Sequence, residues 1–430
     1  MKYGCVRIRE LRIGDDQRVN WQTTMQHLVY HLTIQFRLCF RPSMTLSKTP
    51  FEKFDIDCHE ADSATALANL ADYLIENERL HELFEVRKLQ LRHSLGLRIE
   101  KWQAIDELPT EKGQQLEVGL LEICREIGTR FFQSGQVSEG WQYLEPVGDN
   151  LLLSSLLKEV QVTDENVEAL IQLTVGQGIE AELGFQLVLE RFGTCSSITT
   201  YESQLAMQPL KVRRGPASLL VQHLYRELRQ RVAAVIEEHE GAVDDDSSLI
   251  QLMEGRDWLF QDMGHHVDTT HLASTVRISK IVDQKETIQQ AIELAMYGTR
   301  LHEDFQYPGQ TPFENLYLDS LGFLIALSGG DPATAIRRLS NLASESASFD
   351  AAIWLVYLQD QLDLGAESIR DYLGLIHQQQ AEQMPGEDVC PNLMYLVSKY
   401  RQFDLAKAEL TRMGDLLSYA TVCSIEQQTG

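Results

Sequence analysis

The sequence has little of what nucleic-acid binding or membrane insertion requires. Basic residues are scarce: 38 Lys and Arg stand against 63 Asp and Glu, which gives a net charge of −25. Such a chain lacks the positive surface that attracts a phosphate backbone. It also contains no apolar run of about 18 residues, the length that spans a bilayer, and no signal-peptide pattern. We therefore expect a cytoplasmic protein that binds neither nucleic acid nor membranes.

Paired cysteines and the common catalytic motifs are also absent. The seven cysteines are scattered without a CxxC pair, which predicts reduced thiols and excludes a disulfide framework. The chain has no GxxxxGK[ST] phosphate loop, no GxGxxG after a strand and no GxSxG nucleophile elbow. The usual nucleotide-binding and serine-hydrolase classes are thus excluded.

A helical rhythm of apolar residues fills most of the chain instead. In residues 315–342, leucines recur at helical spacing up to Leu327, a break runs from Ser328 to Pro332, and the rhythm resumes from Ala335. This pattern predicts a helical hairpin with Asp331 capping the second helix. Further hairpins are predicted with turns at residues 77–79, 134–136, 176–178 and 399–402, and another within residues 351–376.

Two of these hairpins resemble the tetratricopeptide repeat. In the hairpin around residue 135, the resemblance rests on Ile127-Gly128, Phe131, Gly135, Gly140 and Leu144. In the later hairpin it rests on Leu321-Gly322, Ile325, Gly329, Ala335 and Leu339, with one extra residue in the turn. The resemblance implies an all-α, right-handed solenoid of antiparallel helix pairs.

Composition divides the chain into five predicted segments. Residues 1–43 carry seven Lys or Arg against three acids, a local excess of +4, and are rich in β-branched and aromatic residues. They are either a small strand-containing arm or a basic extension without a fold, outside the native protein, before a natural start at Met44. The other segments are a helical-repeat region (44–194), a linker (195–216), a central helical region (217–310) and a second helical-repeat region (311–430).

One cluster of potential metal ligands lies in the central region. His265, His266, Asp268 and His271 fall within seven positions, and imidazole and carboxylate groups suit a divalent transition metal such as zinc. A single continuous helix would point them in different directions, so convergence requires His266 in a loop and His271 in the first turn of a helix. Asp268 or Thr269 as the N-cap would produce that arrangement, and the same capping role explains Asp268 without a metal.

The loop at residues 302–313 follows this cluster and leads into the hairpin at residue 315. Its aromatic residues, Phe305, Tyr307 and Phe313, predict either a plug packed between helices or the lining of a pocket. We expect the plug. If the chain has a site beyond a generic groove, we expect it where this loop meets the histidines and the hairpin.

The repeat resemblance implies a scaffold that holds a peptide or partner protein in a groove, through residues of the first helix of each pair. The candidate groove residues are Asn315, Tyr317, Asp319 and Ser320, together with Arg125 and Arg130. Two alternatives remain: a metal-dependent hydrolase or metal-binding protein centred on the histidines, and a structural subunit that packs against copies of itself. The scaffold requires no cofactor.

Overall fold

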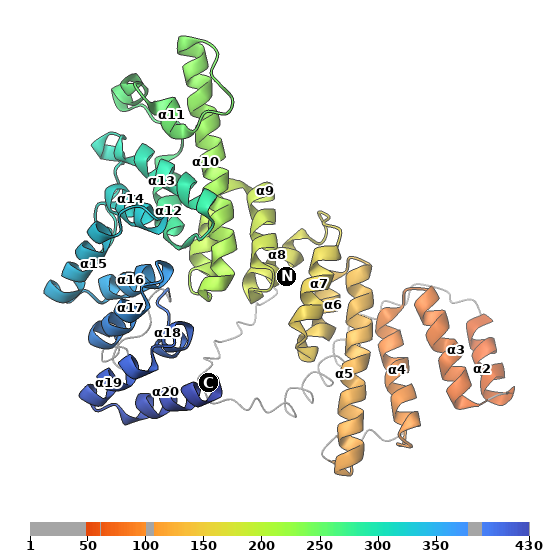
Figure 1. The fold of residues 1–430 in the computed structure, drawn as a ribbon. Coiled ribbons are helices and arrows are strands. Elements are labelled where there is room, and N and C mark those ends of the chain that lie inside the picture. Colours follow the sequence, from red (N-terminus) through yellow and green to blue (C-terminus); the bar gives the residue numbers. More distant parts are fainter. Residues whose placement is uncertain (1–48, 61, 100–106, 377–388, 430) are drawn as a thin grey trace, which may run out of the picture. The chain divides into compact units, whose positions relative to one another are not determined.

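The computed structural model describes residues 49–60, 62–99, 107–376 and 389–429, and helices dominate these ranges (Figure 1). No β-strand occurs within them; an isolated bridge joins Pro308 and Asn315. Consecutive helices pack as adjacent pairs, which confirms the predicted all-α solenoid of helix pairs. The arm predicted for residues 1–43 lies outside the described residues. None of the described helices has the length and apolar character needed to cross a membrane.

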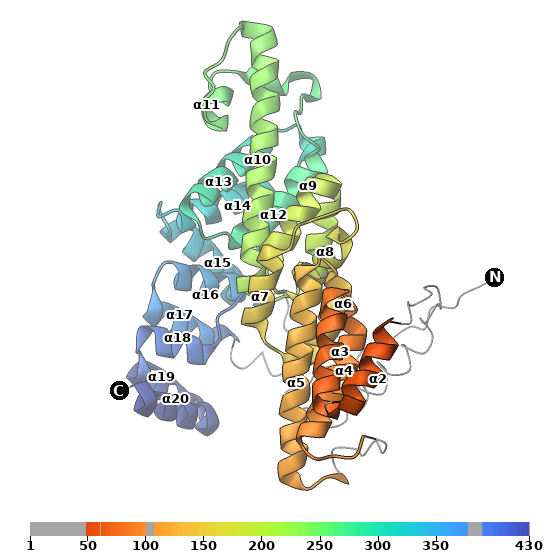
Figure 2. The same ribbon diagram turned by 90° about the vertical axis from the view of Figure 1, so that its right-hand side faces the viewer.

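The chain divides into two compact units between Asn166 and Val167. In the first unit, α3 and α4 form one pair and α5 and α6 another, and α4 lies beside α5 (Figures 1 and 2). Its core joins the pairs through aromatic contacts, with the Phe131 and Tyr143 rings stacked 5.6 Å apart and Phe84 meeting Tyr143 edge-on at 5.0 Å. The helices of this unit are α2 (Thr49–Glu60), α3 (Ser63–Glu76), α4 (Leu80–Ser94), α5 (Thr110–Gln133), α6 (Val137–Leu144), η2 (Glu145–Val147) and α7 (Asn150–Glu159).

The second unit holds the long helix α10 and the later helix pairs (Figure 1). In both units, the turns predicted at residues 77–79 and 134–136 and the break after Leu327 fall between paired helices, while those at 176–178 and 399–402 start within the last residues of α8 and α18. The helices of this unit are α8 (Val167–Gln177), α9 (Ala181–Thr200), η3 (Tyr201–Leu205), α10 (Leu210–Glu240), α11 (Leu249–Met253), η4 (Asp257–Met263), α12 (Thr269–Ile278), η5 (Ser279–Ile281), α13 (Lys285–Thr299), η6 (Glu303–Phe305), α14 (Leu316–Leu327), α15 (Ala333–Glu345), α16 (Phe349–Gln361), α17 (Gly365–Asp371), η7 (Tyr372–Ile376), α18 (Leu393–Tyr400), α19 (Phe403–Met413) and α20 (Leu416–Thr429).

The linker predicted at residues 195–216 is wrong, because this stretch is almost entirely helical. Its Ser and Thr hydroxyls bond carbonyls one turn back, as when Ser197 Oγ donates to the Gly193 carbonyl at 2.9 Å and Ser203 Oγ to the Thr199 carbonyl at 2.6 Å. Ser and Thr therefore continue the helix here. Pro209 occupies the N-cap of α10, where its missing N–H costs nothing. The unit boundary lies at Asn166, about one helix pair earlier.

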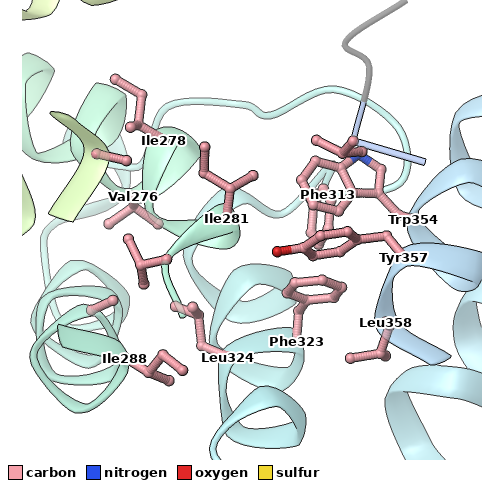
Figure 3. Close-up of a cluster of buried hydrophobic side chains, with 14 of the residues drawn as sticks. Val276, Ile278, Ile281, Ile288, Phe313, Phe323, Leu324, Trp354, Tyr357 and Leu358 are labelled. Carbon is pink, nitrogen blue, oxygen red and sulfur yellow. The ribbon is translucent and has the colours of Figure 1, made fainter. Parts of the chain in front are cut away.

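Aromatic side chains fill the middle of the second unit. Phe313, Phe323 and Trp354 meet edge to face with ring centroids 5.3 to 5.4 Å apart, in the cluster drawn in Figure 3. The Lys280 ammonium lies 4.5 Å above the Phe313 ring centroid. Phe313 comes from the loop at residues 302–313 and is buried between α14 and α16. The predicted plug is thus confirmed for this residue.

Two leucines of α14 form a matched test of this packing. Leu324 is 0% exposed and Leu318 is 58% exposed. We expect Leu324→Ala to lower the free energy of unfolding by about 2–5 kcal/mol, because it leaves a cavity in the core. Leu318→Ala is expected to change it by no more than about 0.5 kcal/mol. Urea titration of both variants checks this, and equal effects would contradict the orientation of α14.

Candidate functional site

The predicted histidine cluster lies at the entry to α12. His265 is exposed, with its Nδ1 3.1 Å from the Met263 carbonyl and its ring 4.9 Å from Phe305. His266 directs its Nδ1 at the Tyr297 hydroxyl of α13, 2.9 Å away. The carboxylate of Asp268 accepts hydrogen bonds from the backbone N–H groups of Thr270 and His271, at 2.8 and 3.3 Å. The predicted N-cap role of Asp268 is therefore confirmed.

These four side chains do not converge on one point. Within the described ranges, no group of three or more His, Cys, Asp or Glu side chains is placed to hold a metal ion. The reason is local: Asp268 is committed to the helix N-terminus, and His266 turns inward to Tyr297 while His265 packs outward on Phe305. The loop does meet the histidine segment, because the Phe305 ring lies 4.9 Å from the His265 ring and the Tyr307 hydroxyl lies 3.2 Å from Thr269 Oγ1. The contact is a packing junction, and the residues are not arranged as a metal centre.

His266 and Tyr297 form a hydrogen-bonded pair. The Tyr297 hydroxyl accepts the backbone N–H of His266 at 2.9 Å and lies 2.9 Å from His266 Nδ1. Burial lowers the pKa of His266, and the neighbouring His265 lowers it further. Burial also raises the pKa of Tyr297 to about 12. Both groups are therefore neutral at physiological pH.

This arrangement predicts a pH-dependent contribution to stability. The pKa of His266 is lower in the folded than in the unfolded state, so the unfolded state binds more protons between the two values. The stabilisation is complete above the unfolded value of about 6.5 and is lost as the pH falls through the folded value. We expect His266→Asn to shrink the stability difference between about pH 5 and pH 7.5. Urea midpoints at several pH values measure it, and an unchanged difference would contradict the assignment.

The four groove residues predicted on α14 have structural roles in the second unit. Tyr317 and Ser320 are 1% and 0% exposed, so the prediction that they face a partner is wrong. Asn315 is the N-cap of α14 and accepts the Leu318 N–H at 3.4 Å. Asp319 forms an ion pair with Arg338 at 2.8 Å, and burial raises its pKa. The exposed face of α14 instead carries Leu318, Gly322 and Ile325.

Two glycines show why Tyr317 points inward. A Cβ added at Gly298 of α13 would lie 2.2 Å from Tyr317 Cδ1, so the ring occupies the space that this glycine leaves open. A Cβ at Gly322 meets nothing within 4 Å.

We therefore expect opposite effects from two identical substitutions. Gly298→Ala should destabilise the protein by about 1–3 kcal/mol, since the buried ring has nowhere to move. Gly322→Ala should stabilise it by about 0.5–1 kcal/mol, because alanine is the better helix former and its methyl group meets open solvent. Thermal unfolding of both variants tests this, and a stabilised Gly298→Ala would contradict the packing of α13 on α14.

The two arginines predicted as groove residues in the first unit, Arg125 and Arg130, are both on α5. Arg125 forms an exposed ion pair with Asp149, and Arg130 pairs with Glu126 at 3.3 Å. Exposed pairs of this kind contribute about 0–1 kcal/mol, so neither arginine is held strongly by its partner. Their role in binding stays a prediction.

The second unit has a pair of adjoining hollows between α10, α13 and the segments next to them. One, of about 630 Å³, lies over α13 between Tyr225 of α10 and Ser328 at the end of α14. The other, of about 580 Å³, lies between α10 and the turn at residues 245–248. Tyr225, Glu286 and Gln290 line both hollows and form a shared centre. Figures 1 and 2 show α13 beside α10 and α14.

A buried carboxylate fixes the floor of the first hollow. Glu293 is 5% exposed, and its Oε2 accepts hydrogen bonds from the Tyr225 hydroxyl and the Leu249 N–H, both at 2.9 Å. The Ile250 N–H lies 3.4 Å from the same oxygen. Burial raises the pKa of Tyr225 to about 12. One carboxylate thus joins α10, the N-terminus of α11 and α13.

The side chains around the shared centre are less engaged in hydrogen bonds and ion pairs. Glu286 is exposed, and no hydrogen bond or ion pair joins it to another described residue. The Oε1 atom of Gln290 is buried, and none of the described groups donates a hydrogen bond to it. Arg229, at the edge, donates to the Ser247 carbonyl at 2.7 Å. The sequence signal was the polar Gln289, Gln290 and Glu293 interrupting the apolar rhythm of one helix, but it does not reveal which other helix faces them.

No protein-family model, no curated protein and no solved structure matches the chain. The interpretation of the site therefore rests on its geometry.

Proposed function

We propose that this protein is a scaffold that binds an extended segment of a partner protein along the paired hollows of α10 and α13. The observation that carries the proposal is the continuity of the two hollows through Tyr225, Glu286 and Gln290. Both hollows are open to solvent, as a surface groove for a peptide is. Two joined hollows of this size suit successive side chains of one peptide better than a single small molecule.

The lining supports a binding role. Its polar groups include both donors and acceptors, as a peptide backbone and its side chains require. The Glu293 network holds the floor in place before any partner arrives, which reduces the ordering cost of binding. The resemblance to tetratricopeptide repeats agrees with a scaffold but places the groove on other residues. We further propose a cytoplasmic setting, in keeping with the five cysteines of the described ranges, which are free thiols.

The arrangement of the predicted ligands does not support the metal-dependent alternative. Three of its predicted ligands, His265, His266 and Asp268, make separate contacts, and the described residues include no group of three or more ligands that also contains His271. Metal analysis of untagged protein remains its direct test.

The scaffold proposal is tested by blocking the hollows. A random-sequence peptide display library is selected against the wild-type full chain, and enriched peptides are titrated by fluorescence anisotropy. We expect Glu286→Trp to weaken binding at least about tenfold, since its side chain fills the shared centre. Glu367→Trp, on the exposed face of α17, is the matched control and should retain binding. Equal binding to both variants, or no enriched peptide, would contradict the proposal.

A further inference from the structure

We infer that the segment bound along α10 and α13 places a lysine or arginine side chain at the shared centre of the two hollows. This inference rests on the proposed function and specifies the chemistry of the partner. The occupant is a cationic side chain of a partner protein, positioned between Glu286 and Gln290.

The shared centre offers acceptors. Tyr225 has its hydroxyl engaged twice, donating to Glu293 and accepting the Leu249 N–H at 3.3 Å. Glu286 supplies a carboxylate that no described cation neutralises, and the enclosed Oε1 of Gln290 has no described donor. Of the common side chains, only Lys and Arg bring several donors and a positive charge together.

None of the three cations of the lining is shared by both hollows. Lys285 lines only the first hollow, and Arg226 and Arg229 line only the second. Asp245 and Asp246 add negative charge to the second hollow. The whole chain, at a net charge of −25, also favours encounter with a basic segment. Charge complementarity therefore selects a cationic group for the centre.

Glu286 also has a purely structural role, since it lies in the first turn of α13, where a negative charge stabilises the helix. That role predicts a small effect of Glu286→Gln on stability. It predicts no effect on peptide binding that depends on which side chains the peptide carries. A binding cycle between protein and peptide separates the two roles.

The test uses the peptides enriched by the wild-type full chain. We expect Lys or Arg at one position of the consensus, and replacing it by norleucine should weaken binding about tenfold or more. Glu286→Gln should produce a similar loss, but the norleucine peptide should lose little further on that variant, because both changes remove the same pair. Glu367→Gln is the matched control. The wild-type affinity for the Lys peptide should also fall with added salt.

The possible results separate this inference from the scaffold proposal. If enriched peptides are blocked by Glu286→Trp but show no cationic position, or if Glu286→Gln and the norleucine change act additively, the inference is wrong and the scaffold proposal stands. If the peptides bind Glu286→Trp as well as wild type, both are wrong. Circular dichroism and urea titration of Glu286→Gln confirm that the variant is folded.

Discussion

The packing of α13 is the constraint on which the second unit depends. Its positions 291–295 are buried without interruption, so this helix is covered on all sides, unlike an ordinary surface helix with one apolar stripe. α10, α11, α12 and α14 pack around it. A helix in this position has to satisfy any polar group it carries, and Glu293 does so through Tyr225 and the N-terminus of α11. Removing one of those partners would leave a buried charge, which is strongly destabilising.

The same constraint determines where a binding site can form. The exposed residues of α13 are near its start, at Lys285, Glu286 and Gln289, because the rest of the helix is covered. Its neighbours α10 and α14 rise on either side, and the hollows lie where the floor comes to the surface. The site is thus a consequence of how a buried helix emerges between its partners. The histidine segment contacts the same helix farther along, at Tyr297, which is buried.

The sequence predicts helix pairs well and their faces poorly. Turn glycines and capping residues such as Gly135 and Asp268 act locally, so the helix boundaries follow from short-range chemistry. Which face of α14 is buried does not follow from short-range chemistry. Apolar residues lie on both its buried and its exposed face, and the pattern of apolar residues does not distinguish Leu318 from Leu324. Groove residues were therefore assigned to the buried side. The prediction of a linker at residues 195–216 was wrong for a related reason. Ser and Thr are typical of loops by composition, but here their hydroxyls donate hydrogen bonds to carbonyls within a helix.

The contrast between floor and rim of the hollows also limits the affinity that the site can reach. The floor is fixed by buried hydrogen bonds, so a bound segment orders only long side chains at the rim, such as Glu286, Arg226 and Lys285. Each immobilised side chain costs about 0.5–1.5 kcal/mol, which offsets much of the gain from an exposed ion pair. The net contribution therefore has to come from excluding water over the floor. The proposed site would in this way favour reversible recognition of short segments, in which one correctly placed cation discriminates between sequences.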